Sequence, residues 1–97
     1  MPKIFNIYTT GKFERDYKKF CNKDFSRRNS VKTFFEILRS NPFSMALRTH
    51  KKYSKRKSLI YSSRVTSDLR ILWEFENECS ILVLELGGHS GKNSVYK

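Results

Sequence analysis

Arg64 and Arg70 could together hold a phosphate group, because sequence parity places them side by side. They flank Ser67-Asp68, a polar pair typical of a tight turn between two strands. Residues two apart share one face of a sheet, so burying the odd-numbered apolar residues on both sides of the turn requires odd positions to pair with odd. That register makes Val65 oppose Leu69. It also puts both arginines on the other face, where like charges repel unless an anion lies between or above them. The odd-numbered apolar residues are Leu59, Tyr61, Val65, Leu69, Ile71, Trp73 and Phe75.

The same parity is equally compatible with a purely structural arrangement of the two arginines. Each guanidinium could pair within the protein with a carboxylate such as Glu74 or Glu85. On the pattern alone, a phosphate-binding pair and two internal ion pairs are both open.

The two histidines, His50 and His89, are the candidate proton-transfer groups. An unperturbed imidazole has a pKa near ~6.5, so either ring can donate or accept a proton at neutral pH. An isolated histidine is more often a structural or surface residue, so residue type alone does not assign either one to a reaction.

Cys21 and Cys79 have no Cys or His at a metal-binding spacing, which predicts no zinc site. We interpret both as thiols of the core. A single disulfide between them stays open.

The chain is strongly basic. Its 97 residues include 20 Lys and Arg against 9 Asp and Glu, a formal charge of +11. Self-repulsion at this charge opposes folding unless a polyanion compensates it, and solubility alone needs a magnitude of only ~2–8 in a small domain. Nucleic acid is therefore the leading partner, ahead of a merely soluble cationic surface and of an anionic membrane.

The chain has no apolar run long enough for a spanning helix, and its first residues have a strand pattern rather than that of a signal peptide, so we expect a cytoplasmic protein.

Hydrophobic periodicity predicts one α+β domain over residues 1–97, in the order β-α-α-β-β-β. A strand is expected at 4–10, a helix at about 12–22, and a second helix that follows polar caps at 26–29 and ends at Asn41-Pro42. Three strands are expected at about 59–66, 69–76 and 79–86. The aromatic residues at helical spacing are interpreted as core. The basic segment 43–58 has little apolar content and is interpreted as a solvated, mobile connection.

Three stretches resemble the RelE/ParE superfamily of toxins. Residues 63–73, Ser-Arg-Val-Thr-Ser-Asp-Leu-Arg-Ile-Leu-Trp, are similar to its central hairpin. Residues 84–89, Leu-Glu-Leu-Gly-Gly-His, with Val95-Tyr96 are similar to its C-terminal signature, and residues 47–51 to the segment ahead of the hairpin in the RelE and YafQ-like branches. The chain departs from the pattern in having Lys52-Tyr53 where a Leu is usual, and in the insertion of residues 90–94 before the Val-Tyr pair. The resemblance implies an antiparallel sheet with two N-terminal helices packed on one face.

The resemblance also implies a metal-independent endoribonuclease that cleaves messenger RNA on the ribosome, inhibits translation, needs no cofactor and is restrained by a cognate antitoxin. Attack by the 2′-hydroxyl would leave a 2′,3′-cyclic phosphate and requires a base, an acid and cations around the phosphorus. Arg70, with Arg64, would hold the phosphate, His50 and His89 would move protons, and Tyr96 would stack on a base or orient the 2′-hydroxyl. Asp68 matches an acidic catalytic position in the YafQ-like branch, but its place in a tight hairpin turn is sufficiently explained by a turn-forming role, which is the favoured interpretation. Glu85 would be a base or would hold Arg70. The residues expected to bind RNA phosphates are Lys12, Arg15, Lys18, Lys19, Arg27, Arg28, Lys51, Lys52, Lys55, Arg56 and Lys57.

Two other functions are compatible with the sequence. A ParE-like inhibitor of DNA gyrase would act by protein contact and would need none of His50, His89 and Tyr96. A non-catalytic RNA-binding module would carry the same charge, and its histidines would be incidental. The joint presence of these three residues favours the nuclease.

Overall fold

The computed structural model describes residues 3–53 and 58–88, with the side chain of Tyr53 excepted. The elements are β1 Asn6–Thr9, α1 Gly11–Cys21, α2 Phe25–Ser40, the 3-10 helix η1 Met45–Leu47, β2 His50–Tyr53, β3 Leu59–Arg64, β4 Leu69–Asn77 and β5 Ser80–Gly88. Both helices and all four predicted strands lie where the sequence places them, within a few residues at each end. In the described part of the chain, no helix is long and apolar enough to cross a membrane.

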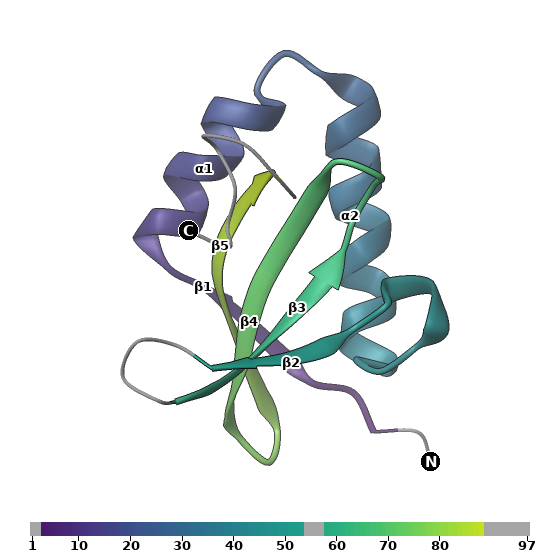
Figure 1. Ribbon diagram of the computed structural model, residues 1–97, viewed down its shortest axis with the longest axis vertical. Helices are drawn as coiled ribbons and strands as arrows, with labels where there is room; N and C mark the ends of the chain where they lie inside the picture. The colour runs from purple at the N-terminus through teal and green to yellow at the C-terminus, as the bar shows by residue number, and fades with distance from the viewer. Residues whose placement is uncertain (1–2, 54–57, 89–97) are drawn as a thin grey trace.

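The five strands form one sheet in the order β1-β5-β4-β3-β2 (Figure 1). β2 to β5 make an antiparallel meander, whereas β1 pairs with β5 in parallel. The expected antiparallel sheet is thus found from β2 to β5, and the parallel pairing of β1 makes the whole sheet mixed. β1 joins the edge through main-chain bonds from Asn6 N to Cys79 O (2.8 Å) and from Thr10 N to Val83 O (3.1 Å). Strand direction has no signature in such a short segment, because alternation looks the same in both orientations.

Both helices begin at a side-chain cap. The Thr10 hydroxyl accepts a hydrogen bond from Phe13 N (3.1 Å), and the Asp24 carboxylate accepts one from Arg27 N (3.0 Å). Such caps satisfy main-chain donors that the first helical turn leaves free, and each contributes about 1 kcal/mol. The predicted polar caps at 26–29 lie just inside α2, whose cap is Asp24.

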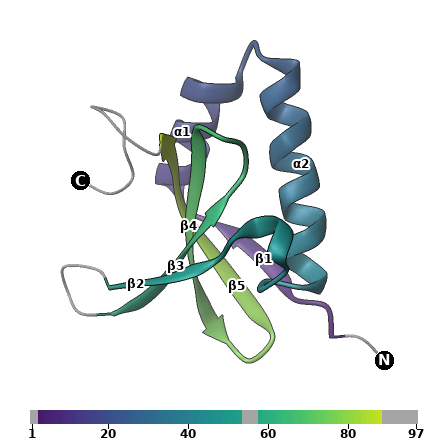
Figure 2. The same ribbon diagram turned by 45° about the vertical axis from the view of Figure 1, so that its right-hand side comes forward.

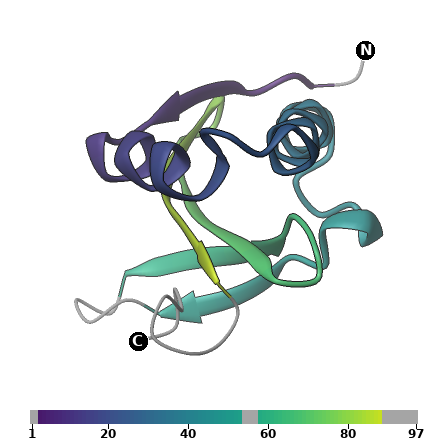
Figure 3. The ribbon, with the colours of Figure 1, turned by 90° about the horizontal axis from the view of Figure 1, so that it is seen from above.

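The main core lies between the two helices and one face of the sheet, as expected. Phe13 of α1 and Val31, Phe34 and Leu38 of α2 pack against buried residues of the two central strands. Each fully buried side chain of this kind stabilises the fold by roughly 1.5–3 kcal/mol relative to leaving it exposed. The sheet is strongly twisted and curves around α2, as the views in Figures 2 and 3 show. The strand residues of this core are Leu69, Ile71, Trp73, Ile81, Val83 and Leu86.

The predicted register of the hairpin between β3 and β4 is confirmed. Arg64 pairs with Arg70 and Tyr61 with Trp73, and the Val65 N–H donates to Leu69 O (3.0 Å). Odd-numbered residues of β4 therefore face the helices and even-numbered residues face away from them.

The prediction for residues 43–58 is wrong over most of the part that the structure describes. η1 and β2 lie in this segment, and Leu47 is buried in the main core. β2 lies at the edge of the sheet and pairs with β3 through the main chain, so it needs few apolar side chains. Its sequence, His-Lys-Lys-Tyr, consequently has the polar composition typical of a solvated loop. Residues 54–57 lie outside the described part.

The two cysteines occupy different environments, and both thiols are free. Cys21, at the end of α1, is fully buried in the main core as expected. Cys79 is exposed in the turn between β4 and β5, so its assignment to the core is wrong. Burial raises the pKa of the Cys21 thiol, which keeps it in the less reactive neutral form.

This difference predicts one fast and one slow thiol in the folded protein. A disulfide reagent such as Ellman's reagent should modify Cys79 rapidly and Cys21 only after denaturant is added, followed by absorbance. Cys79→Ser should remove the fast phase alone. Two rapidly reacting thiols in the native protein would contradict the assignment.

Candidate active site

The face of the sheet turned away from the helices brings together several of the predicted catalytic residues. We call it the outer face and define it by His50, Ser62, Arg64, Arg70 and Glu85. Cross-strand pairing places His50, Ser62, Leu72 and Glu85 in a single row across four strands. Adjacent strands lie about 4.8 Å apart, so roughly 14 Å separates the main chain at the two ends of the row.

The two arginines occupy the next row, toward the turn that joins β3 to β4. Arg64 pairs with Arg70, and Arg70 pairs with Gly87. Among the described residues, no carboxylate lies within ion-pairing distance of either guanidinium. The internal pairing of the arginines with Glu74 or Glu85, which sequence parity left open, is thus not found in this part of the chain.

Arg70 is fixed by the turn that precedes it. Its Nη1 donates to the carbonyl oxygens of Thr66 (2.7 Å), Leu69 (3.0 Å) and Ser67 (3.3 Å). These carbonyls accept hydrogen bonds without cancelling the positive charge. The outer face therefore retains two neighbouring cations, an arrangement suited to binding an anion.

Asp68 lies in the same turn and is accounted for by local contacts. Its Oδ1 accepts a hydrogen bond from the Thr66 hydroxyl (2.7 Å), and its Oδ2 lies 3.1 Å from Arg27 Nη2. The Thr66 hydrogen bond is the main cause that lowers the pKa of Asp68, and the Arg27 charge acts in the same direction. A carboxylate held ionised in this way is a poor general acid at neutral pH. Its geometry supports the turn-forming interpretation.

His50 begins β2 at the edge of the sheet and is exposed. Its Nδ1 lies 3.4 Å from Arg48 O, a long contact for a hydrogen bond. Arg48 adopts a left-handed conformation, with φ of 47°, as it ends η1. This backbone reversal directs the chain from η1 into β2 and so places His50 at the start of the strand.

A chain of hydroxyl groups, of which Ser63 is buried and Thr49 partly buried, anchors the residue before His50. The Thr49 hydroxyl donates to Pro42 O (2.8 Å) and lies 2.6 Å from Ser63 Oγ, which accepts from Trp73 Nε1 (2.8 Å). Since Thr49 uses its hydrogen on Pro42, Ser63 donates to Thr49. The indole of Trp73 thereby fixes the position of β2. This hydrogen-bonded group of Thr49, Ser63 and Trp73 was not identified from the sequence. The available signal was that Thr49 and Ser63 are next in sequence to the candidate residues His50 and Arg64.

Lys52 also lies on the outer face, within electrostatic reach of Glu85. Partial burial lowers the pKa of Lys52, and the negative charge of Glu85 opposes that shift. Lys52 was expected only to neutralise RNA phosphates, whereas the structure brings it near a candidate catalytic carboxylate. Lys51 pairs with Tyr61 and therefore faces the opposite side of the sheet from His50.

The basic residues of the helices are not gathered with Arg70. Lys12 forms an ion pair with Asp16, and Arg27 is engaged with Asp24, Asp68 and the Phe20 carbonyl. The remaining residues of this expected set are exposed on the helices, and the guanidinium of Arg28 lies over the Phe25 ring. These remaining residues are Arg15, Lys18, Lys19 and Arg28.

Five predicted site residues lie outside the described part of the chain: His89, Tyr96, Lys55, Arg56 and Lys57. β5 ends at Gly88, which pairs with Leu69, and His89 is the next residue in the sequence.

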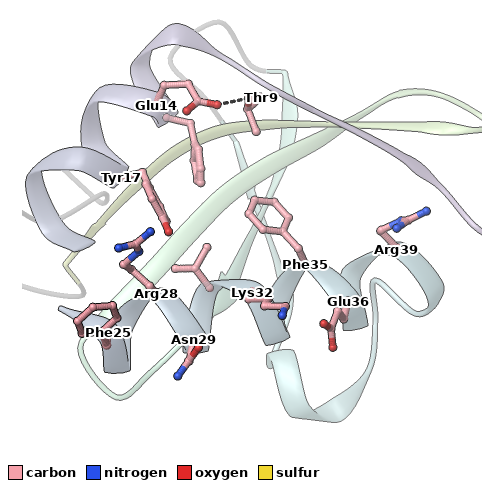
Figure 4. A pocket seen from close by; sticks show the side chains of 12 residues that line it. Thr9, Glu14, Tyr17, Phe25, Arg28, Asn29, Lys32, Phe35, Glu36 and Arg39 are labelled. Carbon is pink, nitrogen blue, oxygen red and sulfur yellow. Dashed lines mark hydrogen bonds between the residues drawn. The ribbon is translucent and has the colours of Figure 1, made fainter. Parts of the chain in front are cut away.

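A groove of about 630 Å³ lies on the other side of the molecule, between the two helices (Figure 4). Phe13, Tyr17 and Phe35 supply apolar surface, and the Thr9 hydroxyl donates to Glu14 Oε1 (2.7 Å) at one end. Charged side chains border it, namely Glu14, Arg28, Lys32, Glu36 and Arg39. No histidine is among the residues that line the groove. Its apolar surface and charged border are better suited to binding an amphipathic peptide than to catalysis.

The described residues contain no group of three His, Cys, Asp or Glu side chains that could hold a metal ion. Neither a known family profile nor a curated protein sequence matches the chain.

The fold matches those of solved bacterial and archaeal toxins. A YoeB/ParE toxin from Agrobacterium tumefaciens has a TM-score of 0.74 at 14% identity, covering 89% of this chain and 100% of that one. YafQ from E. coli has a TM-score of 0.65 at 19% identity, covering 87% and 92%. An archaeal RelE-RelB complex from Pyrococcus horikoshii has a TM-score of 0.67 at 14% identity, covering 86% and 92%. The chain therefore has the fold of the RelE/ParE toxins, as its sequence motifs predicted.

The Asp68 contacts predict a specific loss of stability in acid. Because the pKa of Asp68 is lower in the folded protein, its carboxylate stabilises the fold above the unfolded pKa of about 3.9, and this contribution disappears as the pH falls through the lower folded value. The difference in unfolding free energy between the wild type and Asp68→Asn should therefore shrink below about pH 4, measured by denaturant titration. Ser67→Ala, in the same turn, should show no such dependence. A difference that stays constant to pH 2 would contradict the assignment.

Proposed function

We propose that this protein is the toxin of a type II toxin-antitoxin system, an endoribonuclease that cleaves messenger RNA on the ribosome in the cytoplasm without a metal ion. The observation that carries the proposal is the pairing of Arg64 with Arg70 on a face that also holds His50 and Glu85. Two adjacent cations without a carboxylate partner among the described residues, next to groups that can move protons, are what phosphodiester cleavage requires.

In this proposal the arginines bind the scissile phosphate and stabilise the charge that develops on it. Forked guanidinium donors suit phosphate oxygens, and they contribute most when they are held in place before the reaction. His50 or Glu85 accepts the proton of the 2′-hydroxyl, and His89 protonates the leaving 5′-oxygen. Tyr96 stacks on a base beside the cleaved bond. Lys52 lies within electrostatic reach of Glu85 and adds a third positive charge to the site.

The exposed basic residues of α1 and α2 have a different role in the proposal. They face away from the outer face and would neutralise phosphates of ribosomal RNA. Such contacts position a protein on RNA without reading its sequence, and they weaken as salt concentration rises.

An antitoxin is the second proposed partner. The RelE-RelB complex named above supports it, because a protein of the same fold was solved with its partner bound. We place an amphipathic antitoxin segment in the groove between α1 and α2, with apolar side chains on Phe13 and Phe35 and acidic ones near Arg28 and Lys32. A formal charge of +11 favours an acidic partner.

The test is cleavage of a translated messenger RNA, followed by primer extension and analysis of the new ends. Wild-type protein should cut in the presence of chelator and leave a 2′,3′-cyclic phosphate and a 5′-hydroxyl. Arg70→Ala should lower the single-turnover rate at saturation by about 10²–10³, whereas the matched control Lys18→Ala should weaken ribosome binding and leave that rate unchanged. A 5′-phosphate product would overturn the mechanism.

The same protein distinguishes the two alternative functions. Binding of RNA without cleavage would favour an RNA-binding module. Inhibition of gyrase with neither RNA binding nor RNA cleavage would favour a ParE-like activity.

A further inference from the structure

The turn between β3 and β4 occupies one end of the Arg70 guanidinium and leaves the other end available. Within the described part of the chain, all three hydrogen bonds of the side chain start from Nη1 and end on the main-chain carbonyls of Thr66, Ser67 and Leu69. Among the described residues, Nε and Nη2 have no hydrogen-bond partner. Nε–H and the adjacent Nη2–H point in the same direction, so they form the side edge that binds two phosphate oxygens at once.

The conformation of the turn depends on one hydroxyl group. Thr66 Oγ1 accepts hydrogen bonds from Leu69 N (3.1 Å) and Asp68 N (3.3 Å) and donates to Asp68 Oδ1 (2.7 Å). Removing this hydroxyl would leave two main-chain donors without their acceptor and would remove one hydrogen bond of the Asp68 carboxylate. The carbonyls that hold Arg70 belong to the same four residues, so their directions depend on this network.

Arg27 connects the turn to the helices. Its Nη2 lies 3.1 Å from Asp68 Oδ2, its Nη1 donates to Phe20 O (3.0 Å), and its Nε lies 3.6 Å from Asp24 Oδ2. Phe20 belongs to the last turn of α1, and Asp24 caps α2. Arg27 therefore ties the tip of the hairpin to the junction of the two helices.

We infer that Thr66, Asp68 and Arg27 are positioning residues for Arg70, which hold its guanidinium so that the Nε and Nη2 edge meets the phosphate. The inference rests on the proposed function for the identity of the anion, while the orientation of Arg70 is independent of it. Asp68 then acts through the turn and not by proton transfer, and Arg27 acts through Asp68 and not by binding RNA.

The first arm of the test observes Arg70 directly. In the full chain with ¹⁵N-labelled arginine, NMR should show slowed rotation of the Arg70 guanidinium, with resolved Nη protons assigned by their loss in Arg70→Lys. Thr66→Val, which keeps the shape and removes the hydroxyl, should collapse these signals. Thr66→Ser should retain them, and so should Ser67→Ala, whose hydroxyl has no described partner. Should Thr66→Val fail to fold, Asp68→Ala at an exposed position gives the same readout. Resolved signals in folded Thr66→Val or Asp68→Ala would overturn the inference.

The second arm measures cleavage on translating ribosomes at saturation. Thr66→Val should lower the single-turnover rate by about 10- to 100-fold with ribosome affinity unchanged, and Thr66→Ser should restore it, because a displaced guanidinium stabilises the transition state less. If the wild type cleaves and Thr66→Val cleaves at the same single-turnover rate, the inference is overturned and the proposed function stands. Absence of cleavage by the wild type would remove the proposed function, and the NMR arm would then decide the orientation of Arg70 alone.

Discussion

The pairing of Tyr61 with Trp73 and of Arg64 with Arg70 ties the core and the candidate active site to one hairpin register. A slip of one residue would turn every side chain of β4 to the other face, exposing Trp73 and burying Arg70. Such a slip is opposed by the apolar surface of Ile71 and Trp73 and by the hydrogen bond from the indole to Ser63. The energy of packing on the helix side thus places the two cations on the outer face.

Because packing determines the register, much of this arrangement could be predicted from sequence. Alternation around Ser67-Asp68 was enough to align Arg64 with Arg70, and helical spacing was enough to place α1 and α2. β2 could not be found in this way, since an edge strand is stabilised by main-chain bonds and carries little apolar pattern. The parallel direction of β1 and the hydroxyl chain from Trp73 to Thr49 also escaped prediction, because they join residues far apart in sequence through contacts that have no periodicity.

Holding two arginines together costs stability in the free protein. Like charges that face each other across two strands are unfavourable by a few tenths to about 1 kcal/mol, and nine acidic residues against twenty basic ones offer little compensation. The structure uses main-chain carbonyls to hold Arg70, and these orient the guanidinium without neutralising it. Residual positive charge on a fixed surface is the property that phosphate binding needs. Binding of an anion should therefore stabilise the site around Arg64 and Arg70 more than it stabilises the rest of the protein.

The most direct measurement is therefore the thermal stability of the wild type and of Arg64→Gln, each with and without a short single-stranded RNA at low salt. Arg64 has no ion pair in the described part of the chain, so removing its charge should relieve repulsion and stabilise the free protein by up to about 1 kcal/mol. The same change should reduce the stabilisation that RNA gives, because one phosphate contact is lost. A less stable free Arg64→Gln protein with an undiminished response to RNA would show that Arg64 serves the fold and not an anion, and would contradict the account.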